Sequence, residues 1–168
     1  MFDGQQRGIE GRHVNRLKLT ELAAIPDESL VDAVLQVVWA SEAESDQLRE
    51  GLDIIHAAWL LDAEIQNGGF HQYFWNHKQE HVPMTRKALA RLGAREHLAV
   101  FEEALAALER QPIEPTVGAP ETALGAFSES AMSSPMDSLD DRWYDLPGID
   151  QILVQYIRAN PESVSDHG

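Results

Sequence analysis

The chain has 168 residues, of which 43% are hydrophobic and 24% charged, a composition typical of one folded domain rather than of a disordered segment. It contains no cysteine, which excludes disulfides, thiolate nucleophiles and cysteine-ligated metal sites. Its formal net charge of −15 repels nucleic acid and anionic membrane surfaces, so neither is an expected direct partner.

The charge is unevenly distributed along the chain. Residues 1–20 carry four bases and two acids, a net +2, whereas residues 21–168 carry nine bases and 26 acids, a net −17. A surface of this sign favours cationic partners, and basic proteins are the expected class. The alternative is that the acidity serves only solubility. The chain has no apolar run long enough to span a membrane and no apolar N-terminal stretch, so we expect a cytoplasmic protein. No G-x-G-x-x-G, P-loop or HExxH motif occurs, and no cofactor is expected.

Residues 1–20 have weak periodicity and mixed charge, and they are predicted to form a loose arm. The tetrapeptide at 9–12, Ile-Glu-Gly-Arg, matches a common protease-site linker, so whether this arm is native stays open. Residues 21–163 are predicted to form one helical domain, and residues 164–168 a frayed tail.

Two helices are predicted in the first half of this domain. Asp27 can cap the start of the first, whose apolar residues recur at helical spacing to about residue 43. The second runs from about residue 45 to 66 and, with its heavy apolar turns, is predicted to be the central helix. The Asn-Gly-Gly run at 67–69 ends it, because these residues tolerate the left-handed conformation that a helix exit demands.

The second half is predicted to contain shorter helices. A third helix follows the glycines directly and carries aromatic residues on one face, and a fourth runs from about residue 84 to 92, with Pro83 in its first turn. The remaining helices are expected at about 95–110, 138–145 and 149–159, and the Pro/Gly/Ser-rich segment around 111–136 is predicted to be a long loop. With no alternating strand pattern and no repeat, the sequence predicts a single compact all-α domain of six to seven helices.

Two clusters of titratable residues could carry chemistry. His77, Glu80 and His81 spell H-x-x-E-H, the inverted zinc-peptidase signature, but Pro83 follows at once and a polar loop rich in histidine is the favoured interpretation. Asp62 and Glu64, with His56 and His71 nearby, could form an acid–base cluster. The favoured alternative there is a clamp, in which Glu64 accepts bonds from free backbone amides around residues 69–71.

Acidic side chains recur at helical spacing in three places. Neighbouring acids at i, i+3 or i+4 have Cβ atoms ~5–6 Å apart, near the spacing of successive phosphates along a DNA strand. Like charges left unpaired at this spacing cost stability, which indicates use in binding. The predicted phosphate-mimicking, partner-binding residues are Asp46, Glu50, Asp53, Glu102, Glu103, Glu109, Asp137, Asp140, Asp141 and Asp145.

Residues 64–76, EIQNGGFHQYFWN, resemble a bacterial family, that of DNA mimic protein 19, also catalogued as domain of unknown function 4375. The resemblance extends over about residues 27–163. It implies an all-helical cytoplasmic fold and, for the characterised member, an acidic surface that imitates DNA and occupies the DNA-binding face of a transcription factor. The stretch 77–81, HKQEH, departs from the short small-residue or acidic turn usual in the family, which weakens an acidic face there. The residues that carry the signature are interpreted as parts of a helix corner: Glu64, Asn67, Gly68, Gly69, Phe70, Tyr73 and Phe74.

Together these patterns lead to the hypothesis of a non-enzymatic acidic protein that imitates DNA toward a basic transcription regulator or nucleoid protein. One alternative is an immunity or antitoxin-like module that neutralises a basic toxin or nuclease. A second is a small metal- or carboxylate-dependent hydrolase that uses His77 and His81 or Asp62 and Glu64. The sequence leaves open whether the protein forms a homodimer.

Overall fold

The computed structural model describes residues 17–40, 46–77, 81–113, 127, 131 and 134–165, and the side chains of residues 46–49 lie outside this description. All regular elements within these ranges are helical, which confirms the all-α prediction. The helices are α1 (Leu19–Ala24), α2 (Asp27–Ala40), α3 (Asp46–His77), α4 (Val82–Arg91), α5 (Arg95–Arg110), α7 (Asp137–Tyr144) and α8 (Ile149–Ala159), followed by the short 3-10 helix η1 (Pro161–Ser163). None of the described helices is long and apolar enough to cross a membrane.

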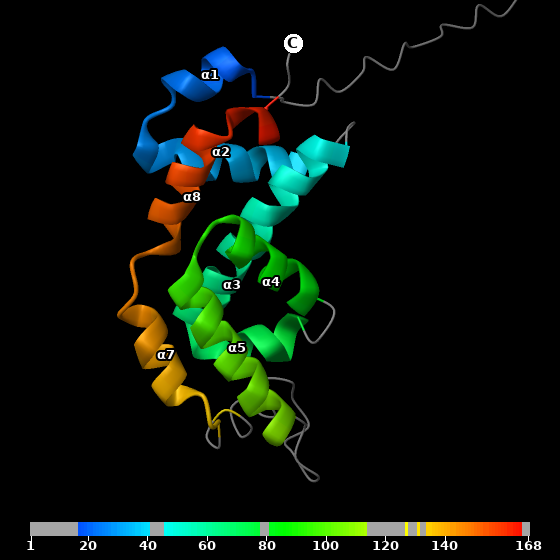
Figure 1. Ribbon diagram of the computed structural model, residues 1–168, viewed down its shortest axis with the longest axis vertical. Coiled ribbons are helices and arrows are strands. Elements are labelled where there is room, and N and C mark those ends of the chain that lie inside the picture. Colours follow the sequence, from blue (N-terminus) through cyan, green and yellow to red (C-terminus); the bar gives the residue numbers. More distant parts are fainter. Residues whose placement is uncertain are drawn as a thin grey trace, which may run out of the picture.

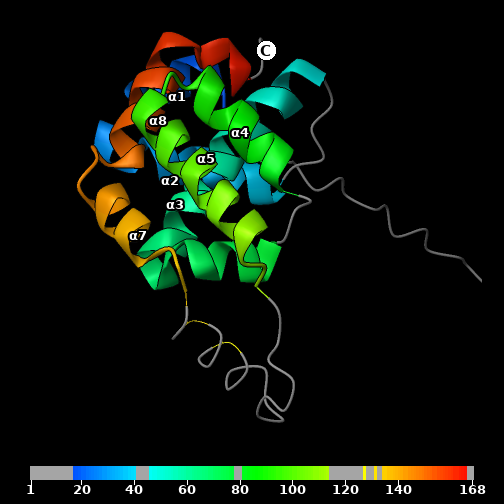
Figure 2. The same cartoon turned by 60° about the horizontal axis from the view of Figure 1, so that its bottom comes forward.

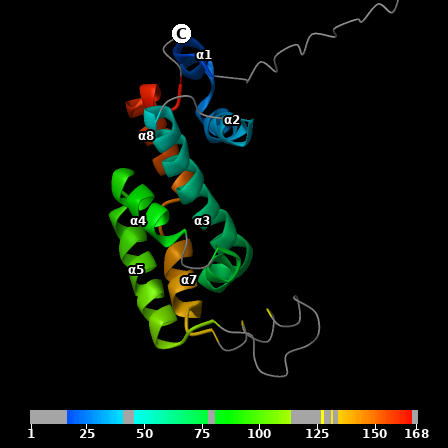
Figure 3. The same cartoon turned by 90° about the vertical axis from the view of Figure 1, so that its right-hand side faces the viewer.

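Helix α3 is the central element, as predicted. It contacts α2, α4, α7, α8 and η1, and Figure 3 shows it running along the molecule with α4 and α5 on one side and α2 on the other at one end. In Figure 1, α1, α2 and α8 gather at one end of the molecule and α7 lies at the other. The fully buried side chains of α3 reflect this central position: Ile54, Ile55, Ala58, Leu61, Ile65, Phe70 and Tyr73.

The predicted stop at residues 67–69 is a kink rather than an end. Gly68 and Gly69 have non-helical backbone angles, and Gly69 adopts a positive φ of 73°. The chain resumes a helical path at once and continues to His77 in a new direction. Figure 2 shows α7 beside this last part of α3. The kink therefore turns residues 70–77, which the sequence predicted as a separate aromatic helix, toward α7.

Two boundaries differ from the predicted arm and tail. Helix α1 begins at Leu19, inside the predicted arm, and its Leu22 side chain is buried against the core. At the other end, Val164 and Ser165 are buried, and the Ser165 hydroxyl donates a hydrogen bond to the carbonyl of Pro161. Packing therefore continues two residues past the predicted boundary of 163. Residues 1–16 and 166–168 lie outside the described residues.

The segment between α5 and α7 falls mostly outside the described residues. Its edges agree with the prediction, because α5 ends at Arg110 and α7 begins at Asp137. Two residues within it, Phe127 and Ala131, have helical backbone. The bounds of the predicted loop are therefore confirmed, whereas its conformation over most of residues 114–133 stays a prediction.

Candidate partner-binding surface

The kink in α3 is built around Gly69 and a side chain from α7. A Cβ atom on Gly69 would collide with the Asp140 carboxylate, and φ is positive there, so the position admits glycine alone without strain. Asp140 Oδ1 accepts a hydrogen bond of 2.7 Å from the backbone N–H of Phe70. Asp140 thus caps the first free amide of the helical segment after the kink, as a local N-cap residue does at an ordinary helix start.

This role separates Asp140 from the other predicted phosphate mimics. Its side chain is half-buried, and burial raises its pKa to about 6. The bond from the Phe70 amide opposes this shift, while the negative charges of Asp137 and Asp141 add to it. Asp140 is therefore engaged in the corner and is not a freely presented surface charge.

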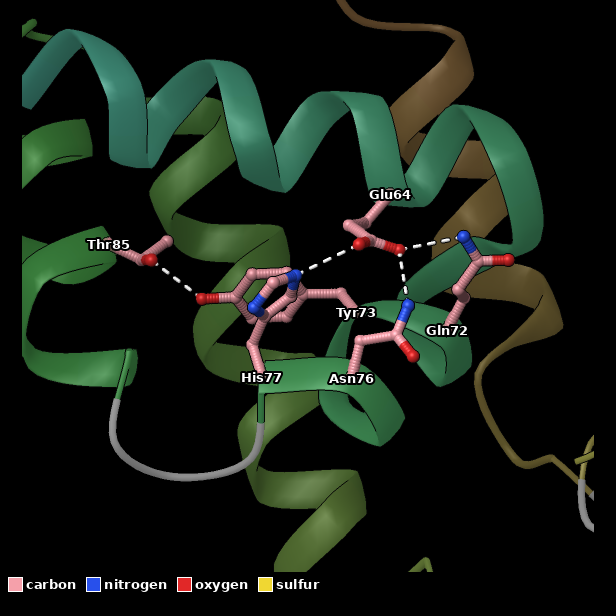
Figure 4. Close-up of polar contacts among 6 residues, drawn as sticks. All are labelled: Glu64, Gln72, Tyr73, Asn76, His77 and Thr85. Carbon is pink, nitrogen blue, oxygen red and sulfur yellow. Dashed lines mark hydrogen bonds and ion pairs between the residues drawn. The ribbon is translucent and has the colours of Figure 1, made fainter. Parts of the chain in front are cut away.

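Glu64 gathers three side-chain donors at the inner side of the same corner (Figure 4). Its carboxylate accepts hydrogen bonds from Gln72 Nε2 at 2.7 Å, Asn76 Nδ2 at 2.9 Å and His77 Nε2 at 2.9 Å. Burial raises the pKa of Glu64, but the three bonds together outweigh it and leave the pKa below its ordinary value. Glu64 is a clamp, but the expected bonds to backbone amides at 69–71 are wrong, since Asp140 takes the Phe70 N–H.

The aromatic residues of the signature belong to the core. Phe70, Tyr73 and Phe74 are buried, and the Phe70 ring lies edge-on to Trp143 of α7 with ring centroids 5.5 Å apart. The Tyr73 hydroxyl shares a hydrogen bond of 2.6 Å with Thr85 of α4 (Figure 4). Of the remaining signature residues, Asn67 and Gly68 are exposed at the kink. The signature forms a packed helix corner, with its aromatic rings buried.

The two histidines of the H-x-x-E-H motif lie at the end of α3 and at the N-cap of α4. Helix α3 ends at His77 and α4 begins at Val82, so the two histidines do not share one continuous helix. Their ring centroids lie 4.9 Å apart, but His77 Nε2 is already bonded to Glu64. Glu80 lies outside the described residues. Within the described part of the chain, no group of three His, Asp or Glu side chains is arranged to hold a metal ion.

The predicted acid–base cluster of Asp62, Glu64, His56 and His71 does not form, because its carboxylates bond to other residues. Asp62 accepts a hydrogen bond of 2.8 Å from the Trp143 indole, whereas Glu64 holds the three donors described above. Burial lowers the pKa of His56 and of His71, which favours the neutral imidazole in both. These contacts hold the carboxylates in structural bonds, and no hydrogen bond joins the four residues to one another.

Several predicted phosphate mimics are neutralised by bases. Glu50 lies 3.0 Å from Lys87 Nζ. Glu102 and Glu103 form two-pronged ion pairs with Arg86 and Arg142, whose second contacts measure 2.8 and 2.9 Å. The inference that these acids are left unpaired is therefore wrong. Of the other predicted residues, Asp53 is half-buried, Glu109, Asp137, Asp141 and Asp145 are exposed, and the Asp46 side chain lies outside the description.

Six aspartates, three of them among the predicted phosphate mimics, form no ion pair with arginine or lysine in the described part of the chain, and we call them the acidic band. Burial raises the pKa of Asp150 at the start of α8, and the charges of Asp62 on α3 and Asp32 on α2 raise it further. The pKa of Tyr144 is raised by burial and then by Asp140, Asp141 and Asp62. Every neighbouring charge that acts on Asp140, Tyr144 and Asp150 is negative. The acidic band crosses four helices and comprises Asp32, Asp62, Asp137, Asp140, Asp141 and Asp150.

The band continues into a groove between α2 and α8 with a volume of about 490 Å³. Four carboxylates line this groove: Asp27, Glu28, Asp32 and Asp150. Asp27 is bonded to Arg158, with Oδ1 2.7 Å from Nη2. Val31, Val154 and two glutamines complete the lining. This groove was not predicted from the sequence, because its two helices lie more than a hundred positions apart in the chain. The one local signal was the i, i+4 spacing of Glu28 and Asp32 on α2.

These features define a class of protein: a small helical domain with an uncompensated acidic face and a tightly bonded helix corner. A family model described as DMP19-like protein matches residues 46–160, and the chain belongs to this family. This confirms the resemblance drawn from residues 64–76. No curated protein and no solved structure matches the chain. The matched region begins at α3 and does not include α1 or α2.

Proposed function

We propose that this protein acts by binding rather than by catalysis, and that it imitates DNA toward a basic DNA-binding protein such as a transcription regulator or nucleoid protein. Membership of the DMP19-like family supports a role in contact with DNA-binding proteins. The acidic band is the observation that carries the proposal, because the charges that act on Asp140, Tyr144 and Asp150 are all negative and none of the band's carboxylates is ion-paired with arginine or lysine among the described residues.

The physical mechanism follows from this repulsion. Carboxylates held near one another raise the energy of the free protein, and arginine or lysine side chains of a partner relieve it on binding. Exposed Asp137 and Asp141 on α7 and Asp32 on α2 stand in for phosphates in this account. Association is then fast and strongly salt-dependent, as for DNA itself.

A capture experiment tests the proposal. The immobilised protein is exposed to lysate of its native cell, and bound proteins are eluted with a salt gradient and, in parallel, with duplex DNA, then identified by mass spectrometry. We expect a DNA-binding protein that both eluents release. The D137N/D141N variant should retain it poorly, whereas the E96Q/E109Q variant, which removes two exposed acids of α5 outside the band, should retain it like the parent.

Two results would contradict the proposal. Equal retention by the D137N/D141N variant and the parent would remove the band from the account. Capture of a toxin or nuclease that duplex DNA does not displace would replace DNA imitation by neutralisation of that protein.

A further inference from the structure

The exposed ridge of α2 ends in an unusual residue. Glu28, Asp32, Gln36 and Trp39 are all exposed, and at about 100° per residue they fall within a sector of roughly 80° on one side of the helix. Trp39 is 57% exposed, the largest such fraction among the large hydrophobic residues found exposed in the described chain. The ridge therefore presents two carboxylates and an indole to solvent on one side of α2.

The exposed Trp39 ring packs against one aromatic neighbour. It makes an edge contact with Trp59 of α3, with ring centroids 5.7 Å apart and planes at 72°. Tryptophan is a frequent energetic centre of protein interfaces. Its face also attracts a cation, and arginine more often than lysine makes this contact, because the planar guanidinium can stack on a ring.

The groove beside the ridge suits the same chemistry. Glu28, Asp32 and Asp150 can pair with charged heads, since of the groove's carboxylates only Asp27 is bonded to Arg158. Val31 and Val154 offer apolar surface for the aliphatic stems of long side chains. From Glu28 to Trp39 the helix rises about 16 Å, which about five residues of extended chain can span. One short segment can therefore contact the groove and the indole together.

We propose that the α2–α8 groove and Trp39 form a docking site for an arginine-rich segment of the DNA-binding partner. This inference rests on the proposed function and specifies the element of the partner that this face receives. Basic arms that reach into the minor groove are common in DNA-binding proteins, and an acidic groove offers such an arm an alternative site. The α2 side of the site lies outside the family match at 46–160, so the docking site is a feature of this chain beyond what that match covers.

The test measures the binding of fluorescein-labelled octa-arginine and octa-lysine to the full chain by anisotropy at low ionic strength. We expect octa-arginine to bind more tightly. The E28Q/D32N variant should weaken both peptides at least about threefold through the loss of two ion-pairing positions. W39L should weaken octa-arginine alone by about threefold, and W39F, which keeps an aromatic face, should lose less. The E96Q/E109Q variant removes the same charge from α5 and should bind both peptides like the parent.

Circular dichroism of each variant confirms that its helices are intact before binding is compared. Equal weakening by E28Q/D32N and E96Q/E109Q would overturn the docking site, since binding would then follow net charge alone. Unchanged octa-arginine binding by W39L would also overturn it. Either result leaves the proposed function standing if D137N/D141N still loses the DNA-binding protein in the capture experiment, so the two failures are distinguishable.

Discussion

At the scale of single residues, two histidines show how strongly a buried imidazole depends on its partners. His97 and His71 are each 3% exposed. His97 Nε2 donates a hydrogen bond of 3.0 Å to the carbonyl of Pro147, whereas neither ring nitrogen of His71 has a partner. His71 instead packs against the rings of Trp75 and Phe127. A buried polar group without a partner costs stability, while a bonded one contributes to it.

The two histidines therefore predict opposite effects of one substitution. H71F removes two unpartnered nitrogens from an aromatic pocket and should leave the free energy of unfolding unchanged or raise it by up to about 1 kcal/mol. H97F loses a hydrogen bond and leaves the Pro147 carbonyl unpaired, which should cost about 1–2 kcal/mol. Urea unfolding followed by circular dichroism measures both. A larger loss for H71F than for H97F would contradict the assignment of His71 as an unpartnered core residue.

Asp140 predicts a specific dependence of stability on pH. Its pKa in the folded protein is about 6, above the ordinary value of 3.8, so the folded state binds this proton more tightly than the unfolded state does. The contribution of Asp140 to stability is therefore fully present below pH 3.8 and is lost as the pH rises through 6.

Comparison with D140N isolates this contribution, because asparagine does not titrate and the other titrating groups are common to both proteins. The free energy of unfolding of D140N minus that of the parent should be larger at pH 7.5 than at pH 5, because only the parent loses stability as Asp140 ionises. Urea unfolding of both proteins at the two pH values measures the difference. A constant difference would show that the carboxylate does not titrate in this range.

At the scale of elements, the kink in α3 depends on the joint requirements of Gly69 and α7. G69A forces a side chain into a positive φ and into the Asp140 carboxylate, whereas Gly93 has a similar φ of 70° with no atom within 4 Å of the added Cβ. G93A should therefore cost about 1 kcal/mol from the backbone alone. G69A should cost clearly more, and urea midpoints of the two variants measure the difference. Equal costs would mean that α7 moves aside freely.

Local patterns predicted most of these elements from the sequence. Apolar spacing placed α2, α3, α5 and α8 to within a few residues, and the Asn-Gly-Gly run located the kink. The cap on the Phe70 amide was not predictable, because Asp140 is 70 positions away and nothing local marks it. Helix α1 was missed because it is six residues long and buries one side chain, which leaves no periodicity to read.

At the scale of the whole molecule, the sequence gives the number of acids but not which of them are neutralised. Glu50, Glu102 and Glu103 find bases on other helices, and no spacing rule relates Arg142 to Glu103. The proximity of Asp32, Asp62 and Asp150 likewise depends on how α2, α3 and α8 pack. The sequence therefore predicted an acidic binding face, while the fold decides where the uncompensated charge lies.

The most direct test of the acidic band is a competition on the captured DNA-binding protein. The partner is bound to fluorescein-labelled duplex DNA, and the parent, D137N/D141N and E96Q/E109Q proteins are titrated in while anisotropy is recorded. We predict that the parent and the α5 control release the duplex with equal potency, and that D137N/D141N needs several-fold more protein. A complex in which the duplex stays bound, or equal potency of D137N/D141N, would contradict the claim that this band takes the place of DNA.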